Sequence, residues 1–127
     1  MLSSKPHLTA LAGVSVVIIV LCLIPELRLS SRRYLHFVQS DKVLHFASFL
    51  LLGFLAFLSF RGLGRTRMLA IGFSLLYCWL LGGLTELLQP LAGRSAENGD
   101  FLADVLGSSG GMAIGLALTL IRNRRTG

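Results

Sequence analysis

Charged residues are scarce in this chain, and their scarcity argues against an ordinary water-soluble fold. Asp, Glu, Lys and Arg make up 14% of the 127 residues, while hydrophobic residues make up 54%. The charged share of a typical soluble domain is about 25%. A soluble protein of this size would lack the polar surface needed to cover itself, so the composition predicts a protein whose outer surface faces lipid. The length suits one domain, covering residues 1–127.

Cysteine is also scarce, and the two cysteines present give no basis for a thiolate metal centre or a redox motif. Cys22 and Cys78 both lie inside apolar runs, and their separation in the sequence fits neither kind of site. A free cysteine in apolar surroundings behaves as a small hydrophobic residue. We therefore expect two buried thiols, and we predict no cofactor.

Acidic residues are outnumbered by basic ones, but the pattern does not favour a nucleic-acid-binding protein. There are 12 Lys and Arg against 6 Asp and Glu, which gives a net charge of +6. Such an excess is one mark of nucleic-acid binding. Here most basic residues lie in the short gaps between apolar runs, where membrane topology explains them better. We predict contact with membrane lipid and no nucleic-acid partner.

Four apolar runs predict an all-α polytopic membrane protein, a bundle of four transmembrane helices. A spanning helix needs about 17–25 residues, and the first run is at the short end of that range. Pro25 ends this run, and no signal-peptide cleavage site of small residues follows it. The connection at residues 27–41 is expected to be either a surface amphipathic helix or a polar loop. The predicted spans cover residues 8–24, 43–60, 68–88 and 101–121.

Basic residues near the ends of the spans predict the orientation. Four spans place both termini and the turn at residues 61–67 on one side of the membrane. Basic residues near span ends favour the cytoplasmic side, so we predict that both termini are cytoplasmic. The margin is modest because the first connection is itself basic. The predicted cytoplasmic side carries Lys5, Arg61, Arg65, Arg67, Arg122, Arg124 and Arg125, and the other side carries Arg28, Arg32, Arg33, Lys42 and Arg94.

Polar residues gather at the span ends that lie away from the termini. Asp41 and His45 are four residues apart and share a helix face, as do Asp100 and Asp104. If the chain crosses the membrane four times, these groups meet at its extracytoplasmic face. We predict that the following residues form one binding site: Asp41, Lys42, His45, Glu86, Gln89, Arg94, Asp100 and Asp104.

Three interpretations of this cluster stay open. It can be structural, with Lys42 and Arg94 neutralising carboxylates and helix N-termini favouring aspartates. That account fits Glu86 poorly, because a helix C-terminus disfavours negative charge. His45 can act in acid–base catalysis with Glu86 or Asp104, which makes these three the candidate catalytic residues. The side chains also suit a metal ion, but no tight ligand motif is present, and we predict no metal.

Small residues recur at intervals of four along the last predicted span. Such ridges let helices approach closely in membranes. Asp100, Asp104 and Ser108 form the adjacent stripe. If the ridge packs closely on another helix, the carboxylates of Asp100 and Asp104 are buried against protein rather than lipid. The ridge consists of Ala103, Gly107, Gly111 and Gly115.

Three blocks of sequence carry a family resemblance. They are residues 41–46 (DKVLHF) at the start of a span, residues 85–89 (TELLQ) at the end of one, and Arg94 with Asp100 and Asp104 leading into Gly107. In order and spacing these blocks resemble the VanZ-like membrane proteins, over about residues 25–115. Where that family often has Asn, this chain has Asp104, which adds a negative charge to the site.

The resemblance implies a small multi-pass protein of the bacterial cytoplasmic membrane. The family takes its name from a member associated with resistance to the glycopeptide teicoplanin, and most members have no established activity. The expected function is to bind or modify a lipid-linked or cell-wall component at an outward-facing polar site, with an effect on glycopeptide susceptibility. Two alternatives stay open: a membrane-embedded enzyme using His45 and carboxylates, and a non-catalytic accessory subunit of an envelope complex. A homo-oligomer or an envelope partner protein fits either alternative.

Overall fold

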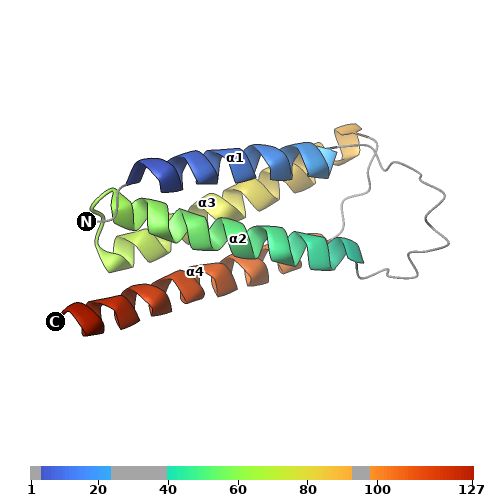
Figure 1. Cartoon of the computed structure of the whole chain (residues 1–127). Helices are drawn as coiled ribbons and strands as arrows, with labels where there is room; N and C mark the ends of the chain where they lie inside the picture. The colour runs from blue at the N-terminus through green and yellow to red at the C-terminus, as the bar shows by residue number, and fades with distance from the viewer. Residues whose placement is uncertain (1–3, 24–39, 93–97) are drawn as a thin grey trace.

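The described residues form long helices that run side by side along the length of the molecule (Figure 1). A computed structural model describes residues 4–23, 40–92 and 98–127, and these ranges contain no strand. In chain order the elements are α1 (Ser4–Leu23), α2 (Ser40–Gly62), α3 (Arg67–Leu88), the short 3₁₀ helix η2 (Pro90–Ala92) and α4 (Asn98–Thr126). The predicted all-α class is confirmed. The two ends of the chain and the turn between α2 and α3 lie at the same end of the bundle (Figure 1).

Three of the helices are long and apolar enough to cross a membrane. The qualifying stretches are Lys42–Gly62 of α2, Arg67–Leu88 of α3 and Gly99–Thr126 of α4. The apolar part of α1, Lys5–Leu21, is shorter, so the first of the four predicted crossings stays a prediction. Large apolar side chains are exposed on the outer surfaces of all four helices, as a lipid-facing bundle requires. Examples are Val16, Leu51, Leu80, Leu84, Leu106 and Leu118.

Glycines bring the backbones of α2 and α4 into close contact, and this pair shares the most extensive contact in the bundle. A side-chain carbon on Gly107 would collide with the carbonyl of Phe46, and one on Gly111 would collide with the carbonyl of Leu50. Because main-chain atoms cannot move aside cheaply, only glycine fits at these positions. The close packing predicted for the small-residue ridge is therefore confirmed, and α2 is the helix against which it packs.

A tight turn at the other end of α2 reverses the chain into α3. Gly64 has a φ of 78°, a left-handed conformation that glycine adopts without steric cost. The Leu63 amide donates to the Ser59 carbonyl at 3.0 Å, which ties the turn to the end of α2. Thr66 then caps α3, its hydroxyl accepting a hydrogen bond from the Leu69 amide at 3.3 Å.

The helix α1 covers α2 and α3 on the side away from α4 and is fastened by a buried polar contact. Ser15 Oγ donates to the Leu11 carbonyl at 2.7 Å. Its distance to the Tyr77 hydroxyl is 2.6 Å, so Tyr77 is the donor in that contact. Cys78 is buried nearby, as predicted, whereas the side chain of Cys22 lies outside the described residues. The buried apolar core comprises Leu11, Ile18, Phe49, Leu52, Ala56, Cys78 and Leu81.

Candidate functional site

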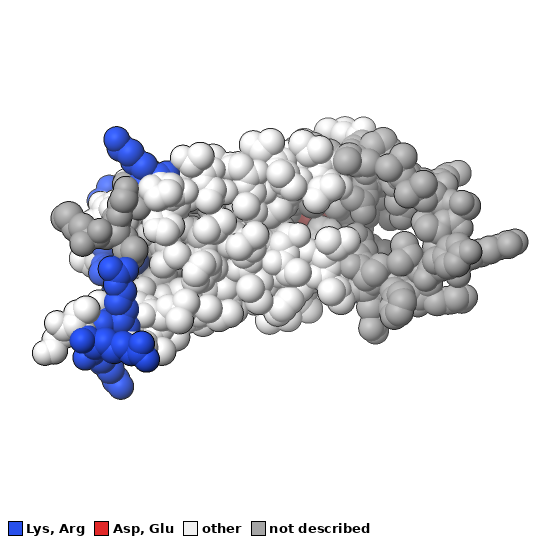
Figure 2. All heavy atoms as spheres, in the orientation of Figure 1, with Lys and Arg blue, Asp and Glu red and all other residues white. Residues whose placement is uncertain are grey.

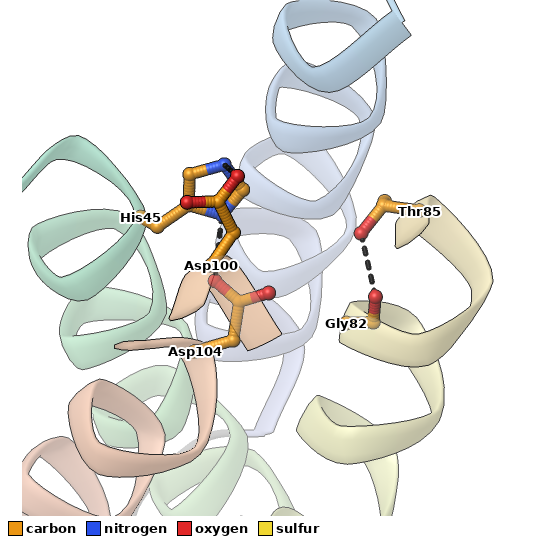
Figure 3. Close-up of polar contacts among 5 residues, drawn as sticks. All are labelled: His45, Gly82, Thr85, Asp100 and Asp104. Carbon is orange, nitrogen blue, oxygen red and sulfur yellow. Dashed lines mark hydrogen bonds and ion pairs between the residues drawn. The ribbon is translucent and has the colours of Figure 1, made fainter. Parts of the chain in front are cut away.

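A histidine on α2 lies between two aspartates on α4 (Figure 3). These residues lie near the start of α2 and of α4, at the end of the bundle far from the termini (Figure 1). His45 Nδ1 is 2.8 Å from Asp104 Oδ1, and His45 Nε2 is 3.9 Å from Asp100 Oδ2. The first distance is that of a charge-assisted hydrogen bond, and the second is too long for a hydrogen bond. His45, Asp100 and Asp104 are 6%, 3% and 1% exposed, so these polar groups meet inside the bundle.

The glycine contact between α2 and α4 explains why these side chains meet. Gly107 packs on the carbonyl of Phe46, and His45 immediately precedes Phe46 in the chain. Asp104 lies one helical turn before Gly107 on the same side of α4. Fixing Gly107 against Phe46 therefore places the carboxylate of Asp104 beside the imidazole of His45. Asp100 lies a further turn toward the start of α4 and is within its first turn, where the helix dipole favours negative charge.

A face of α3 closes the site on the side opposite His45. A side-chain carbon on Gly82 would lie 3.1 Å from Asp104 Oδ2, so α3 approaches this carboxylate closely. The Thr85 hydroxyl donates to the Gly82 carbonyl at 2.8 Å, and Thr85 lies across from the two aspartates in Figure 3. Thr85 and Gln89 are 0% and 1% exposed. Gly82, Thr85 and Gln89 lie three and four residues apart and so share one helix face.

Two further predicted residues lie at the same end of the bundle. Lys42 lies over the start of α4, because a side-chain carbon on Gly99 would lie 2.6 Å from Lys42 Cε and 3.5 Å from Lys42 Nζ. Its ammonium group is thus next to the turn that carries Asp100. Glu86 is partly buried and follows Gly82 by four residues, which places it on the same side of α3.

Six of the eight residues predicted to form the site lie at one end of the bundle. His45, Asp100 and Asp104 are brought into contact, and Lys42, Glu86 and Gln89 lie at the same end of the bundle. The side chain of Asp41 and the whole of Arg94 lie outside the described residues, so their part in the site stays a prediction. Thr85 was missed as a site residue. Its spacing from Gln89 was the available signal, since four residues on a helix define one face.

The geometry permits two kinds of chemistry. An imidazole that is held at Nδ1 by a carboxylate has a fixed ring orientation, as in general acid–base sites. The same imidazole in its protonated form would join the two aspartates by charge, which is a structural role. Within the described ranges, no three His, Cys, Asp or Glu side chains are placed to hold a metal ion. The imidazole and the two carboxylates can form hydrogen bonds and can transfer protons.

Comparisons with protein-family models, with curated proteins and with solved structures found no match to this chain.

Proposed function

We propose that this chain is a VanZ-like multi-pass protein of the bacterial cytoplasmic membrane that binds or modifies a lipid-linked or cell-wall component at its outer face. The order of the three sequence blocks supports the family. The orientation is supported by the gathering of basic side chains at the end that carries both termini (Figure 2), because basic residues near span ends favour the cytoplasm. The histidine–aspartate site then faces outward.

The observation that carries the proposal is the buried contact between His45 and Asp104 across α2 and α4. Ionisable residues within membrane-spanning segments are costly, and they commonly mark functional sites. Capping by the helix N-terminus accounts for Asp100, which lies in the first turn of α4. It does not account for Asp104, which lies one turn deeper and is 1% exposed. A second carboxylate on the other side of the imidazole adds a group that a purely structural pair would not need.

Binding to a lipid-linked cell-wall precursor tests this proposal. The full chain is placed in phosphatidylcholine nanodiscs, and bound undecaprenyl-linked disaccharide pentapeptide is measured by native mass spectrometry. We expect saturable binding that falls about tenfold or more in Asp104→Ala, because this variant loses the acceptor that holds the imidazole of His45. Arg65→Ala, at the other end of the bundle, is the matched control and should bind normally. In bacteria at matched expression, the same pair should differ in teicoplanin susceptibility. Absence of precursor binding together with unchanged susceptibility would contradict the proposal.

A second candidate function is a membrane-embedded enzyme that uses His45 as an acid–base group. The 2.8 Å distance between His45 Nδ1 and Asp104 Oδ1 favours it, because a carboxylate partner orients the ring for proton transfer at its other nitrogen. Turnover of the bound precursor that is lost in His45→Ala would favour the enzyme. Binding without turnover in the wild-type chain would favour a binding protein or a non-catalytic accessory subunit.

A further inference from the structure

The end of the bundle with both termini carries many basic side chains, and the sequence supplies no acidic one there. Figure 2 shows Lys and Arg gathered at this end. Residues 1–25, 42–85 and 105–127 contain no Asp or Glu, and these stretches include both termini and the turn between α2 and α3. Within them no side-chain carboxylate can neutralise the cations, so an anion from outside is favoured. The basic residues are Lys5, Arg61, Arg65, Arg67, Arg122, Arg124 and Arg125.

The turn between α2 and α3 holds one of these cations in a defined position. Arg61 Nη1 donates to the Arg65 carbonyl at 2.6 Å, and Arg61 Nε is buried. The turn is held in its own shape by the Gly64 amide, which donates to the Arg61 carbonyl at 3.0 Å, and by the Arg65 amide, which donates to the Phe60 carbonyl at 3.2 Å. A guanidinium that is already oriented loses little freedom when it binds an anion.

The start of α3 adds positive charge on the other side of the same turn. Arg67 is the first residue of α3, and the first turn of this helix contains no acidic residue. The first amides of a helix lie at the positive end of its dipole. A cation at this position is unfavourable for the helix itself. An anion at the turn would therefore be stabilised by Arg61, by Arg67 and by the dipole of α3 together.

Exposed apolar side chains border these cations and indicate what kind of anion fits. Leu63 lies within the turn and is exposed, and Met68, which follows Arg67, is 77% exposed. A soluble anion would contact the guanidinium groups without covering these apolar side chains. An anionic phospholipid satisfies both, because its phosphate accepts charge-assisted hydrogen bonds from arginine and its acyl chains cover apolar surface.

We propose that the turn between α2 and α3 binds a phospholipid with a net negative headgroup, with its phosphate at Arg61 and Arg67 and its acyl chains along Leu63 and Met68. This surface lies at the opposite end of the bundle from the histidine–aspartate site, so the proposal stands whether or not a cell-wall precursor binds there. In the proposed orientation the surface lies in the cytoplasmic leaflet, where anionic lipids attract basic segments next to a membrane.

The end of α4 supplies a charge-matched control for this surface. Arg124 and Arg125 lie in the last turn of α4 and are exposed. The negative end of the helix dipole already stabilises cations at this position, whereas it opposes them at the start of α3. We therefore expect Arg124 and Arg125 to attract anionic lipid only by their charge, without a defined binding geometry.

The test measures which lipids stay bound to the full chain. The protein is purified from nanodiscs made of equal amounts of phosphatidylglycerol and phosphatidylcholine, and retained lipid is counted by native mass spectrometry. We expect the wild-type chain to retain phosphatidylglycerol about tenfold or more over phosphatidylcholine. Arg61→Gln/Arg67→Gln should lower this ratio about fivefold or more, because each basic residue near the surface contributes to the attraction. Arg124→Gln/Arg125→Gln removes the same charge and should keep most of the ratio.

A conservative variant separates geometry from charge. Arg61→Lys keeps the charge, and with it the basis of the orientation, but loses the planar pair of donors that a phosphate accepts from. We expect it to lower the ratio by about threefold or more. This measurement stands even where the double variant of the turn fails to insert.

The remaining outcomes decide the proposal. Equal retention of the two lipids by the wild-type chain would overturn it. Equal losses in the two double variants would mean that charge alone attracts the lipid, which would overturn a site at the turn, and a normal ratio in Arg61→Lys would overturn the oriented guanidinium. Excess glycerol phosphate should leave the ratio unchanged, since it has no acyl chains. If it displaces phosphatidylglycerol, the site takes a free phosphate and the proposed lipid is wrong.

Discussion

The two ends of the bundle carry their charges in different ways. At the end with both termini, the basic side chains lie at helix ends and are mostly exposed, as with Arg65, Arg67 and Arg124. At the opposite end, His45 and Asp104 lie inside the bundle, with 6% and 1% of their surfaces exposed. Exposed charges near a membrane interface keep their hydration, so they cost little and serve as anchors. Buried charges lose that hydration and need partners, so their positions must be fixed by the packing around them.

Reporter fusions test the largest difference between the ends, which is the side of the membrane on which each lies. Fusions after Arg67 and after Gly127 should report the cytoplasm, and an insertion near Ala96 should report the outside, because basic residues gather at the first end. Alkaline phosphatase and green fluorescent protein give opposite signals in the two compartments and check each other. A cytoplasmic signal at Ala96 would mean that the predicted orientation is wrong and that the site does not face outward.

The packing of α2 against α4 buries His45 and Asp104. Substitutions that disrupt this packing should have the largest effect on stability. Gly111→Leu should prevent these helices from closing, because even a single added carbon would collide with the carbonyl of Leu50. We expect a loss of about 3 kcal/mol or more of unfolding free energy, at the upper end of overpacking effects, or no folded protein. Gly110→Leu is a matched control, since nothing lies within 4 Å of a carbon added there. Equal thermal melting curves for the two variants in detergent would contradict the close contact.

This packing shows how far the sequence determines the fold. The intervals of four at Gly107, Gly111 and Gly115 predicted a close-packed ridge, because helix periodicity is a local property. The partner was not predictable, since which helix lies opposite depends on the whole bundle. Gly53 of α2 was missed for this reason: it packs on the backbone of Ser108, and nothing in its local sequence indicates that contact.

Replacing one charged residue at each end of the bundle tests whether burial makes that residue important to stability. Asp104→Ala should lower the unfolding free energy by about 1–3 kcal/mol, because it removes the buried hydrogen bond between the imidazole of His45 and this carboxylate. Arg65→Ala should leave the midpoint of unfolding unchanged, since Arg65 is exposed. Chemical unfolding in a mixed-micelle detergent measures both. A similar loss of unfolding free energy in both variants would mean that buried Asp104 contributes no more to stability than exposed Arg65.

A smaller effect is expected from the predicted coupling of Glu86 to Arg94. A carboxylate at a helix C-terminus needs compensation, and a guanidinium supplies two parallel hydrogen bonds that Lys cannot reproduce. Glu86→Gln and Arg94→Lys should each weaken precursor binding, and the double variant should be little worse than either single one. Coupling between contacting residues is about 0.5–3 kcal/mol. Binding losses that add fully in the double variant would mean that Glu86 and Arg94 are not coupled. Normal binding by both single variants would mean that neither residue belongs to the site.

The site itself was predictable only in outline. Alternating span directions placed His45, Asp100 and Asp104 at one end, because a chain that crosses repeatedly must bring alternate helix ends together. The particular contact of His45 with Asp104 depends on the register between Gly107 and Phe46, which is a tertiary property. The helices also extend past the apolar runs: α2 begins at Ser40 and α4 at Asn98, rather than at residues 43 and 101. Hydropathy marks the part that suits lipid, whereas hydrogen bonding and capping set where a helix begins.

The most direct test of a ligand site at the buried end compares two histidines in the same molecule. The chain is labelled with ¹⁵N-histidine, placed in nanodiscs and titrated with the lipid-linked precursor while imidazole signals are recorded. His45 lies within the site, and His7 lies on α1 at the other end. We predict that the ring signals of His45 shift saturably while those of His7 stay unchanged, because only His45 lies beside the bound group. Precursor binding that leaves His45 unchanged, or that shifts both histidines equally, would contradict the account.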